Sequence, residues 1–111
     1  MNFRLPHGAP ATLRPDDLAY EGRWRIGPSY STADQSGARL YLRFRARRVF
    51  LVLGTRGGQR QVEVAVDGSR RRPVTVGPHR LYELVRFARL GDHLLTLTFE
   101  RGIEAYAFTF G

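Results

Sequence analysis

Three histidines, His7, His79 and His93, are the side chains of this sequence best suited to act as a general base. Nucleophilic catalysis needs a nucleophile, a base and an orienting group in contact, and Asp92 beside His93 could supply the orienting carboxylate. The alternative is that His79 and His93 are ordinary turn and strand-end residues. Because no Gly-x-Ser-x-Gly motif supplies a nucleophile, the sequence favours this alternative and we expect no catalytic residues.

Metal and redox chemistry lack the ligands they require. The sequence of 111 residues contains no cysteine, which excludes thiol exchange, disulfides and cysteine-ligated zinc or iron–sulfur centres for this polypeptide. The histidines have neither HxH nor HExxH spacing, and the acidic residues form no DxDxDG calcium loop. We therefore expect no cofactor and no metal site, although scattered aspartates and backbone carbonyls leave calcium binding open.

Aromatic rings beside guanidinium groups form the pattern that points to ligand binding. Such rings offer flat apolar platforms for sugar rings or bases, and neighbouring arginines can orient the ligand. Tyr41 shares its predicted strand face with arginines, as a ligand contact or as part of a solvated face. Trp24 lies between two arginines, as a ligand platform or as an anchor of the core. The predicted ligand-binding residues are Trp24, Tyr30, Arg39, Tyr41 and Arg43.

The net charge is +8, from 18 basic and 10 acidic residues, which makes an anionic partner worth testing. Every basic residue is an arginine, and this choice either serves phosphate recognition or reflects a GC-rich coding sequence. The arginines spread along the whole chain, which favours the second explanation, and the chain has no RNP-type motif. A basic domain that binds anions or nucleic acid is the alternative hypothesis, with nucleic acid the less favoured partner.

The elements that must position these residues are short β-strands. Residues 1–17 are rich in proline and lack periodicity, which predicts a linker or N-terminal arm, and residues 18–111 then form one domain. Runs of β-branched and aromatic residues, separated by Gly, Pro, Asp and Ser, predict about eight or nine strands and no long helix. The expected fold is an all-β antiparallel β-sandwich of the jelly-roll type, with a small barrel as the alternative.

Alternation along the strands predicts which faces are buried. In residues 38–46 every second side chain is apolar, so one face should enter the core and the other should be basic. Residues 49–53 are apolar throughout, which predicts a strand covered on both faces. Residues 80–87 predict a strand, with a helix as the alternative. Further predictions are a strand over residues 61–66 with Val62, Val64 and Val66 inward, a turn at Asp67-Gly68, and a C-terminal hairpin of residues 93–99 and 103–110.

Several of these runs, taken in their order, resemble one known family. They are LAYEGRW (residues 18–24), ARLYLRF (38–44), VFLVLG (49–54), VAVDG (64–68), RLY (80–82), GDHLLTL (91–97) and YAFTFG (106–111). The resemblance covers about residues 14–111 and is to the C-terminal, carbohydrate-binding-module-like domain of DipZ-type cytochrome c biogenesis and thioredoxin-like proteins.

This resemblance implies a jelly-roll sandwich that follows a thioredoxin-like domain with a CxxC redox pair. In full membrane-anchored members the domain faces outside the cytoplasm. Because this sequence has no CxxC, it cannot itself exchange disulfides. The resemblance therefore implies a non-catalytic accessory module of a thiol:disulfide oxidoreductase that recognises a carbohydrate or a protein partner, such as the adjacent thioredoxin-like domain.

Neither a membrane span nor a secretion signal is expected in this sequence. No apolar run approaches the length needed to cross a bilayer, and the N-terminus lacks an apolar h-region. We therefore expect an extracytoplasmic location within a DipZ-type protein and a cytoplasmic one otherwise.

Overall fold

A computed structural model describes residues 17–111, which form nine β-strands and no helix. The strand pairs are antiparallel, which confirms the predicted all-β fold class. A membrane-spanning helix is accordingly not found among these residues. The arm predicted over residues 1–17 lies outside the described part of the chain except for its last residue. The strands are β1 (Leu18–Glu21), β2 (Trp24–Ile26), β3 (Ser31–Ala33), β4 (Ala38–Gly54), β5 (Arg60–Val66), β6 (Ser69–Arg70), β7 (Val74–Val76), β8 (Arg80–Phe99) and β9 (Glu104–Phe110).

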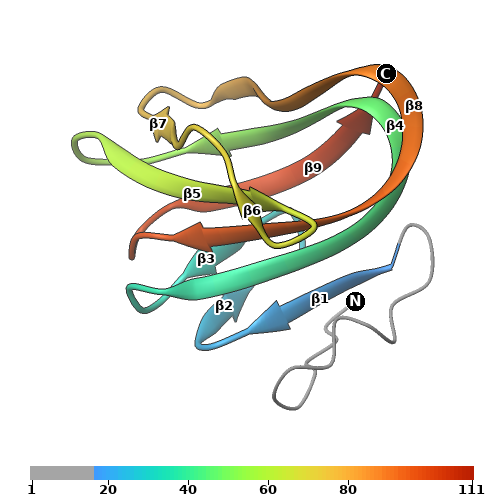
Figure 1. Cartoon of the computed structure of the whole chain (residues 1–111). Helices are drawn as coiled ribbons and strands as arrows, with labels where there is room; N and C mark the ends of the chain where they lie inside the picture. Colours follow the sequence, from blue (N-terminus) through green and yellow to red (C-terminus); the bar gives the residue numbers. More distant parts are fainter. Residues whose placement is uncertain (1–16) are drawn as a thin grey trace.

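The strands form two facing layers that share the long strands β4 and β8 (Figure 1). In the first, which we call the β5 layer, the first half of β4 lies between β1 and the second half of β8, and β8 pairs with β5. Strands β6 and β7 pair with β5 at its other edge. In the second, which we call the β9 layer, the second half of β4 lies between the first half of β8 and β9, and β3 and β2 follow.

The path from β2 to β6 does not close on itself, so the architecture is the predicted sandwich and not a barrel. The two layers are joined where β4 and β8 bend together, on the right in Figure 1. At this bend Ala46 pairs with Gly91 whereas Arg48 pairs with Arg86, so a single residue of β4 faces a longer segment of β8. Such a bulge increases the local twist and bends a strand without ending it. The sequence analysis predicted two separate strands in each of these regions, and the structure corrects this to one continuous strand in each.

The core fills the space between the layers, as the alternation predicted. The inward side chains of β5 and of the first half of β4 are buried, and so are those of the second half of β8. After the bend, the side chains of Phe50 and Val52 are only half-buried, so the prediction that residues 49–53 are covered on both faces is wrong. The largest fully buried side chains are Phe44, Phe99, Leu40, Leu51, Leu53, Leu95, Leu97 and Ile103.

The C-terminal segment departs from the predicted hairpin. Strand β9 pairs with β3 and β4 in the β9 layer and does not pair with β8. The turn at Arg101-Gly102 carries the chain from one layer to the other, and the Gly102 N–H donates to the Ala33 carbonyl. The predicted turn at Asp67-Gly68 is confirmed, with φ angles of 51° and 83° in the left-handed region.

Candidate functional site

A row of polar side chains crosses the outer face of the β5 layer. The antiparallel register places Glu21 of β1 opposite Arg39 of β4, Arg39 opposite Thr98 of β8, and Thr98 opposite Glu63 of β5. Directly opposite residues of antiparallel strands project on the same face of the sheet. Four adjacent strands therefore present a carboxylate, a guanidinium, a hydroxyl and a second carboxylate in that order. The Arg39 side chain is 49% exposed, and its Nη1 lies 3.8 Å from Glu21 Oε1.

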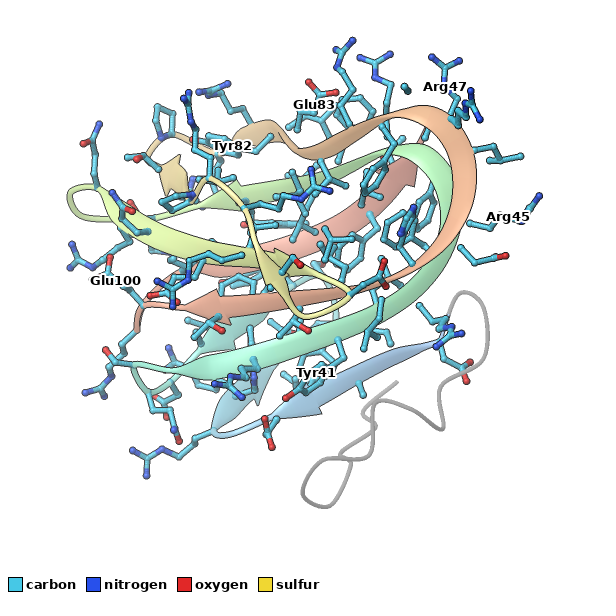
Figure 2. All side chains as sticks on the ribbon, in the orientation of Figure 1. Tyr41, Arg45, Arg47, Tyr82, Glu83 and Glu100 are labelled. Carbon is cyan, nitrogen blue, oxygen red and sulfur yellow. The ribbon has the colours of Figure 1, made fainter. Side chains whose placement is uncertain are left out.

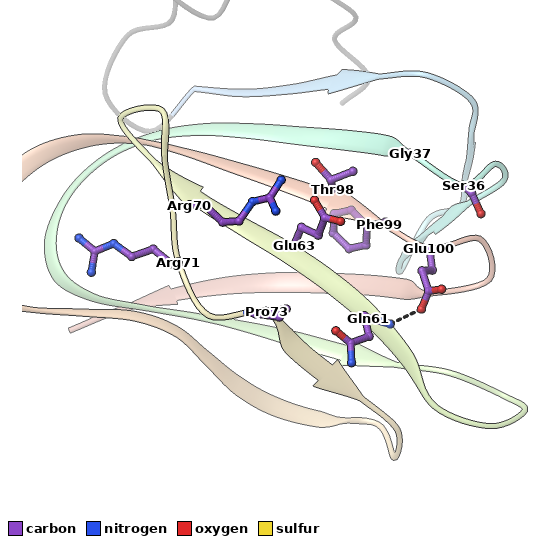
Figure 3. Close-up of a pocket in the computed structure, with 10 residues that line it drawn as sticks. All are labelled: Ser36, Gly37, Gln61, Glu63, Arg70, Arg71, Pro73, Thr98, Phe99 and Glu100. Carbon is purple, nitrogen blue, oxygen red and sulfur yellow. Dashed lines mark hydrogen bonds between the residues drawn. The ribbon is translucent and has the colours of Figure 1, made fainter.

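The chain that follows β5 borders this row and turns it into a groove (Figure 3). A cavity of about 460 Å³ is lined by Glu63 and Thr98 together with Arg70 of β6. An adjoining hollow of about 270 Å³ shares these three residues and extends to Arg39 and Thr96. We call this surface, made of Arg39, Glu63, Arg70, Thr96 and Thr98, the β5 groove. It offers hydrogen-bond donors and acceptors to the same ligand.

Tyr41 lies beside the groove, but its ring is covered. The residue is 8% exposed and packs with Ala19 and Leu94, because β1 pairs alongside β4 and encloses this part of the face. Its hydroxyl donates a hydrogen bond to Glu21 Oε1 at 2.6 Å. Burial, and after it this hydrogen bond, raises the pKa of Tyr41. The expectation of an exposed Tyr41 ring is therefore wrong, because alternation predicts the face of a side chain but not what covers that face.

Arg43 lies at the other end of the same face, opposite Leu94 on β8. Its neighbour is Asp67, whose carboxylate contacts His93 Nδ1 at 2.7 Å and accepts the Leu94 N–H at 2.9 Å. Burial acts to raise the pKa of Asp67, but these hydrogen bonds and the charge of Arg43 lower it overall. Arg43 therefore borders the turn after β5, beyond the groove.

Trp24 packs against the core. Its ring makes edge contacts with Tyr20 and Phe99 at centroid distances of 5.1 and 5.0 Å, and its Nε1 donates to the Glu21 carbonyl. These contacts match the interpretation of Trp24 as an anchor of the core. The structure thus brings Arg39, Tyr41 and Arg43 together on one face and places Trp24 between the layers.

Tyr30 lies on the β9 layer, away from Arg39, Tyr41 and Arg43. Its ring stacks on that of Tyr106 with 4.9 Å between centroids, and its hydroxyl accepts a hydrogen bond from Arg56 Nη2 at 3.2 Å. Tyr30 is therefore part of a second polar cluster, which the sequence analysis did not anticipate.

The centre of this second cluster is Glu104, whose side chain is only 6% exposed. Its Oε1 hydrogen-bonds to His79 Nε2 at 2.8 Å and its Oε2 accepts from Arg56 Nε at 2.6 Å. Burial acts to raise the pKa of Glu104, but the hydrogen bonds from His79 and Arg56 outweigh it and hold the pKa below its usual value. Its one sequence signal was that it is the single charged residue in the terminal run from Ile103 to Phe110.

Of the three histidines, His79 and His93 lie in the described part of the chain and each contacts a carboxylate on another strand or turn, whereas His7 lies outside the described residues. His79 contacts Glu104, and His93 contacts Asp67 while stacking on Phe87 at 4.2 Å. Asp92, the suggested orienting group, instead pairs with Arg45 at 2.9 Å. Arg45 and its neighbour Arg47 project outward at the bend (Figure 2). Within residues 17–111, no group of three or more histidine, aspartate or glutamate side chains is arranged to hold a metal ion.

Fold and site together define an antiparallel β-sandwich domain with a polar groove on one outer face. The chain belongs to the family described as the thioredoxin-like C-terminal domain, whose model matches residues 5–111. It is similar to the protein DipZ of Mycobacterium bovis and of Mycobacterium tuberculosis, with 29% identity over 105 residues in both comparisons. The match covers 92% of this chain and 14% of DipZ, so the chain spans a small part of these relatives.

A solved structure shares this fold. A family two carbohydrate esterase from Clostridium thermocellum in complex with cellohexaose superimposes with a TM-score of 0.77 at 24% identity, over 86% of this chain and 31% of the esterase chain. This likeness confirms the predicted β-sandwich fold and, at this identity, establishes the fold alone.

Proposed function

We propose that this domain is a non-catalytic accessory module of a thioredoxin-like thiol:disulfide oxidoreductase of the cytochrome c biogenesis type, and that it recognises a carbohydrate in the β5 groove. The accessory role is supported by the family of the chain and by its likeness to a small part of DipZ. Disulfide exchange would belong to the rest of the parent protein, because this chain has no cysteine. In such a parent the module lies outside the cytoplasm.

The observation that carries the carbohydrate proposal is the polar row across β1, β4, β8 and β5. Each hydroxyl of a sugar both donates and accepts hydrogen bonds, so a carboxylate as acceptor beside a guanidinium group as donor suits a neutral sugar. Glu63 accepts, Arg39 and Arg70 donate, and Thr98 can do either. Hydrogen bonds that involve one charged partner are stronger than neutral ones.

Recognition in this groove depends on polar contacts more than on aromatic stacking. The Tyr41 ring is covered, so Tyr41 acts as a positioning residue: its hydroxyl holds Glu21 Oε1, which lies 3.8 Å from Arg39 Nη1. Without a stacking platform, we expect weak affinity for a single sugar and higher affinity for a chain that spans several strands.

Binding of neutral oligosaccharides, with cellohexaose as the first probe, tests this proposal. The purified 111-residue chain is titrated by calorimetry at low and at moderate salt. We expect binding that changes little with salt, because a neutral ligand releases few counterions, and a loss of about tenfold or more in Arg39→Gln. Arg47→Gln is the matched control, since it removes the same charge from the same strand at the bend and should bind like the wild type.

Two outcomes would contradict the proposal. Binding only to polyanions, lost on addition of salt and weakened equally in Arg39→Gln and Arg47→Gln, would favour a basic surface without a sugar site. No binding to any neutral oligosaccharide would favour a protein partner, for which the adjacent thioredoxin-like domain is the simplest choice.

A further inference from the structure

A second row of residues crosses the outer face of the β9 layer. Arg25 of β2 lies opposite Thr32 of β3, Thr32 lies opposite Glu104 of β9, and Glu104 lies opposite Gly54 of β4. Arg25, Thr32 and Glu104 line a cavity of about 420 Å³, together with Tyr30 and Arg56. A pyranose ring with its substituents fits a space of this size. This cavity is separate from the β5 groove, because its lining residues belong to the opposite layer.

The charges of the cavity do not balance. Glu104 is its one carboxylate, and both of its oxygens are already engaged, by His79 and by Arg56. Arg25 is exposed, and no ion pair or hydrogen bond of its side chain is found within residues 17–111. Two guanidinium groups therefore face a single, fully used carboxylate, which leaves one positive charge for a ligand to neutralise.

The walls of the cavity suit a small ring that bears polar groups. Tyr30 is held in place by stacking on Tyr106, and Ile26 and Pro28 contribute apolar surface. The hydroxyls of Tyr30 and Thr32 can donate to or accept from a ligand. A flat aromatic ring beside apolar and hydroxyl groups matches a sugar better than a fully charged ligand such as phosphate.

Gly54 fixes the buried side of the site. A Cβ at this position would collide with the imidazole of His79, so the ring packs directly on the glycine backbone. His79 is thereby held against Glu104, and Glu104 in turn holds the Nε of Arg56. The Arg56 guanidinium is therefore pre-oriented, and less conformational entropy is lost when a ligand binds to it.

We propose that this cavity binds a carboxylate-bearing sugar, with Arg25 and Arg56 on the carboxylate and Tyr30 beside the sugar ring. The site is independent of the β5 groove. A sugar acid meets the unused positive charge, whereas a neutral sugar leaves Arg25 without a partner and finds no free carboxylate as acceptor.

The test compares methyl glucuronide with methyl glucoside, two sugars that differ in a carboxylate against a hydroxymethyl group. Amide chemical shifts of the isotope-labelled chain are followed by NMR during each titration. We expect the glucuronide to give saturable shifts around Thr32 and Glu104 and the glucoside to give none at these residues. Arg25→Gln should weaken glucuronide binding about tenfold, whereas Arg47→Gln should leave it unchanged. Tyr30→Phe should weaken it less.

The proposal is overturned if both sugars give equal shifts around Thr32 and Glu104, if the glucuronide gives no saturable shift there, or if Arg25→Gln and Arg47→Gln bind the glucuronide equally. Acetate serves as the probe for the carboxylate alone, and acetate binding as tight as that of the glucuronide would assign the site to simple anions. If the chain binds the glucuronide in this cavity but binds no neutral sugar in the β5 groove, the proposed function is rejected and this inference stands.

Discussion

Glu104 is the buried residue on which polar contacts from three segments of the β9 layer converge. A carboxylate with so little exposure requires partners, because an unpaired buried charge is strongly unfavourable. His79, Arg56 and the Tyr106 hydroxyl supply them, and the nearby negative charge in turn contributes, after burial, to raising the pKa of Tyr106. Glu104 is thus a positioning residue for the cavity above it.

The low pKa of Glu104 predicts how stability depends on pH. In the unfolded chain the group titrates near its ordinary value of 4.5, and in the folded chain it titrates below that value. Its contribution to stability is therefore complete above about pH 4.5 and is lost as the pH falls through the folded pKa. We expect the free energy of unfolding, measured with denaturant at a series of pH values, to fall less steeply in acid for Glu104→Gln. Parallel curves for the wild type and Glu104→Gln would contradict this.

At the scale of elements, the turn between β5 and β6 allows the cost of a left-handed backbone conformation to be measured separately from side-chain contacts. Gly68 has a φ of 83° and a substituent there would meet no atom within 4 Å, so an alanine adds only the cost of the left-handed conformation. We expect Gly68→Ala to destabilise the fold by about 1 kcal/mol in denaturant unfolding. Gly57→Ala is the matched control: its Cβ also meets open space, and its φ is not in the left-handed region. It should be neutral or slightly stabilising. Equal effects of both substitutions would reject the argument.

The strands also show which features of the fold the sequence could predict. Period-two alternation in residues 38–46, 61–66 and 93–99 placed the buried faces correctly, because alternation depends only on local geometry. The partner of β9 was predicted wrongly, since pairing with β3 and β4 depends on contacts between residues far apart in the chain. The continuity of β4 and β8 was missed because their bulge interrupts the pattern at the bend.

The candidate sites were predictable only in part, for a similar reason. Arg39 was found because its strand alternates regularly, but its partners Thr98 and Glu63 lie on strands brought beside it by tertiary pairing. The cavity around Glu104 joins strands β2, β3 and β9 with the loop after β4, and no local pattern connects these segments. Single residues of such a site, such as Tyr30, can be suggested from the sequence, whereas their grouping requires the fold.

For the whole molecule, the sharing of β4 and β8 between both layers predicts cooperative unfolding. One buried cluster contains side chains from both layers, so neither layer can lose its packing alone. We expect a single thermal transition with equal calorimetric and van't Hoff enthalpies, and similar opening free energies from hydrogen exchange in β5 and in β9. Two transitions, or one layer exchanging at a much lower free energy, would show that the bend uncouples the layers.

The packing of Trp24 gives this molecule an optical property. Trp24 is the single tryptophan of the sequence, and its ring contacts Phe99, a core side chain that is only 1% exposed. The indole fluorophore therefore reports on the core of the sandwich from the β2 edge. Its emission should shift when this edge separates from the core during unfolding, without a label on the protein.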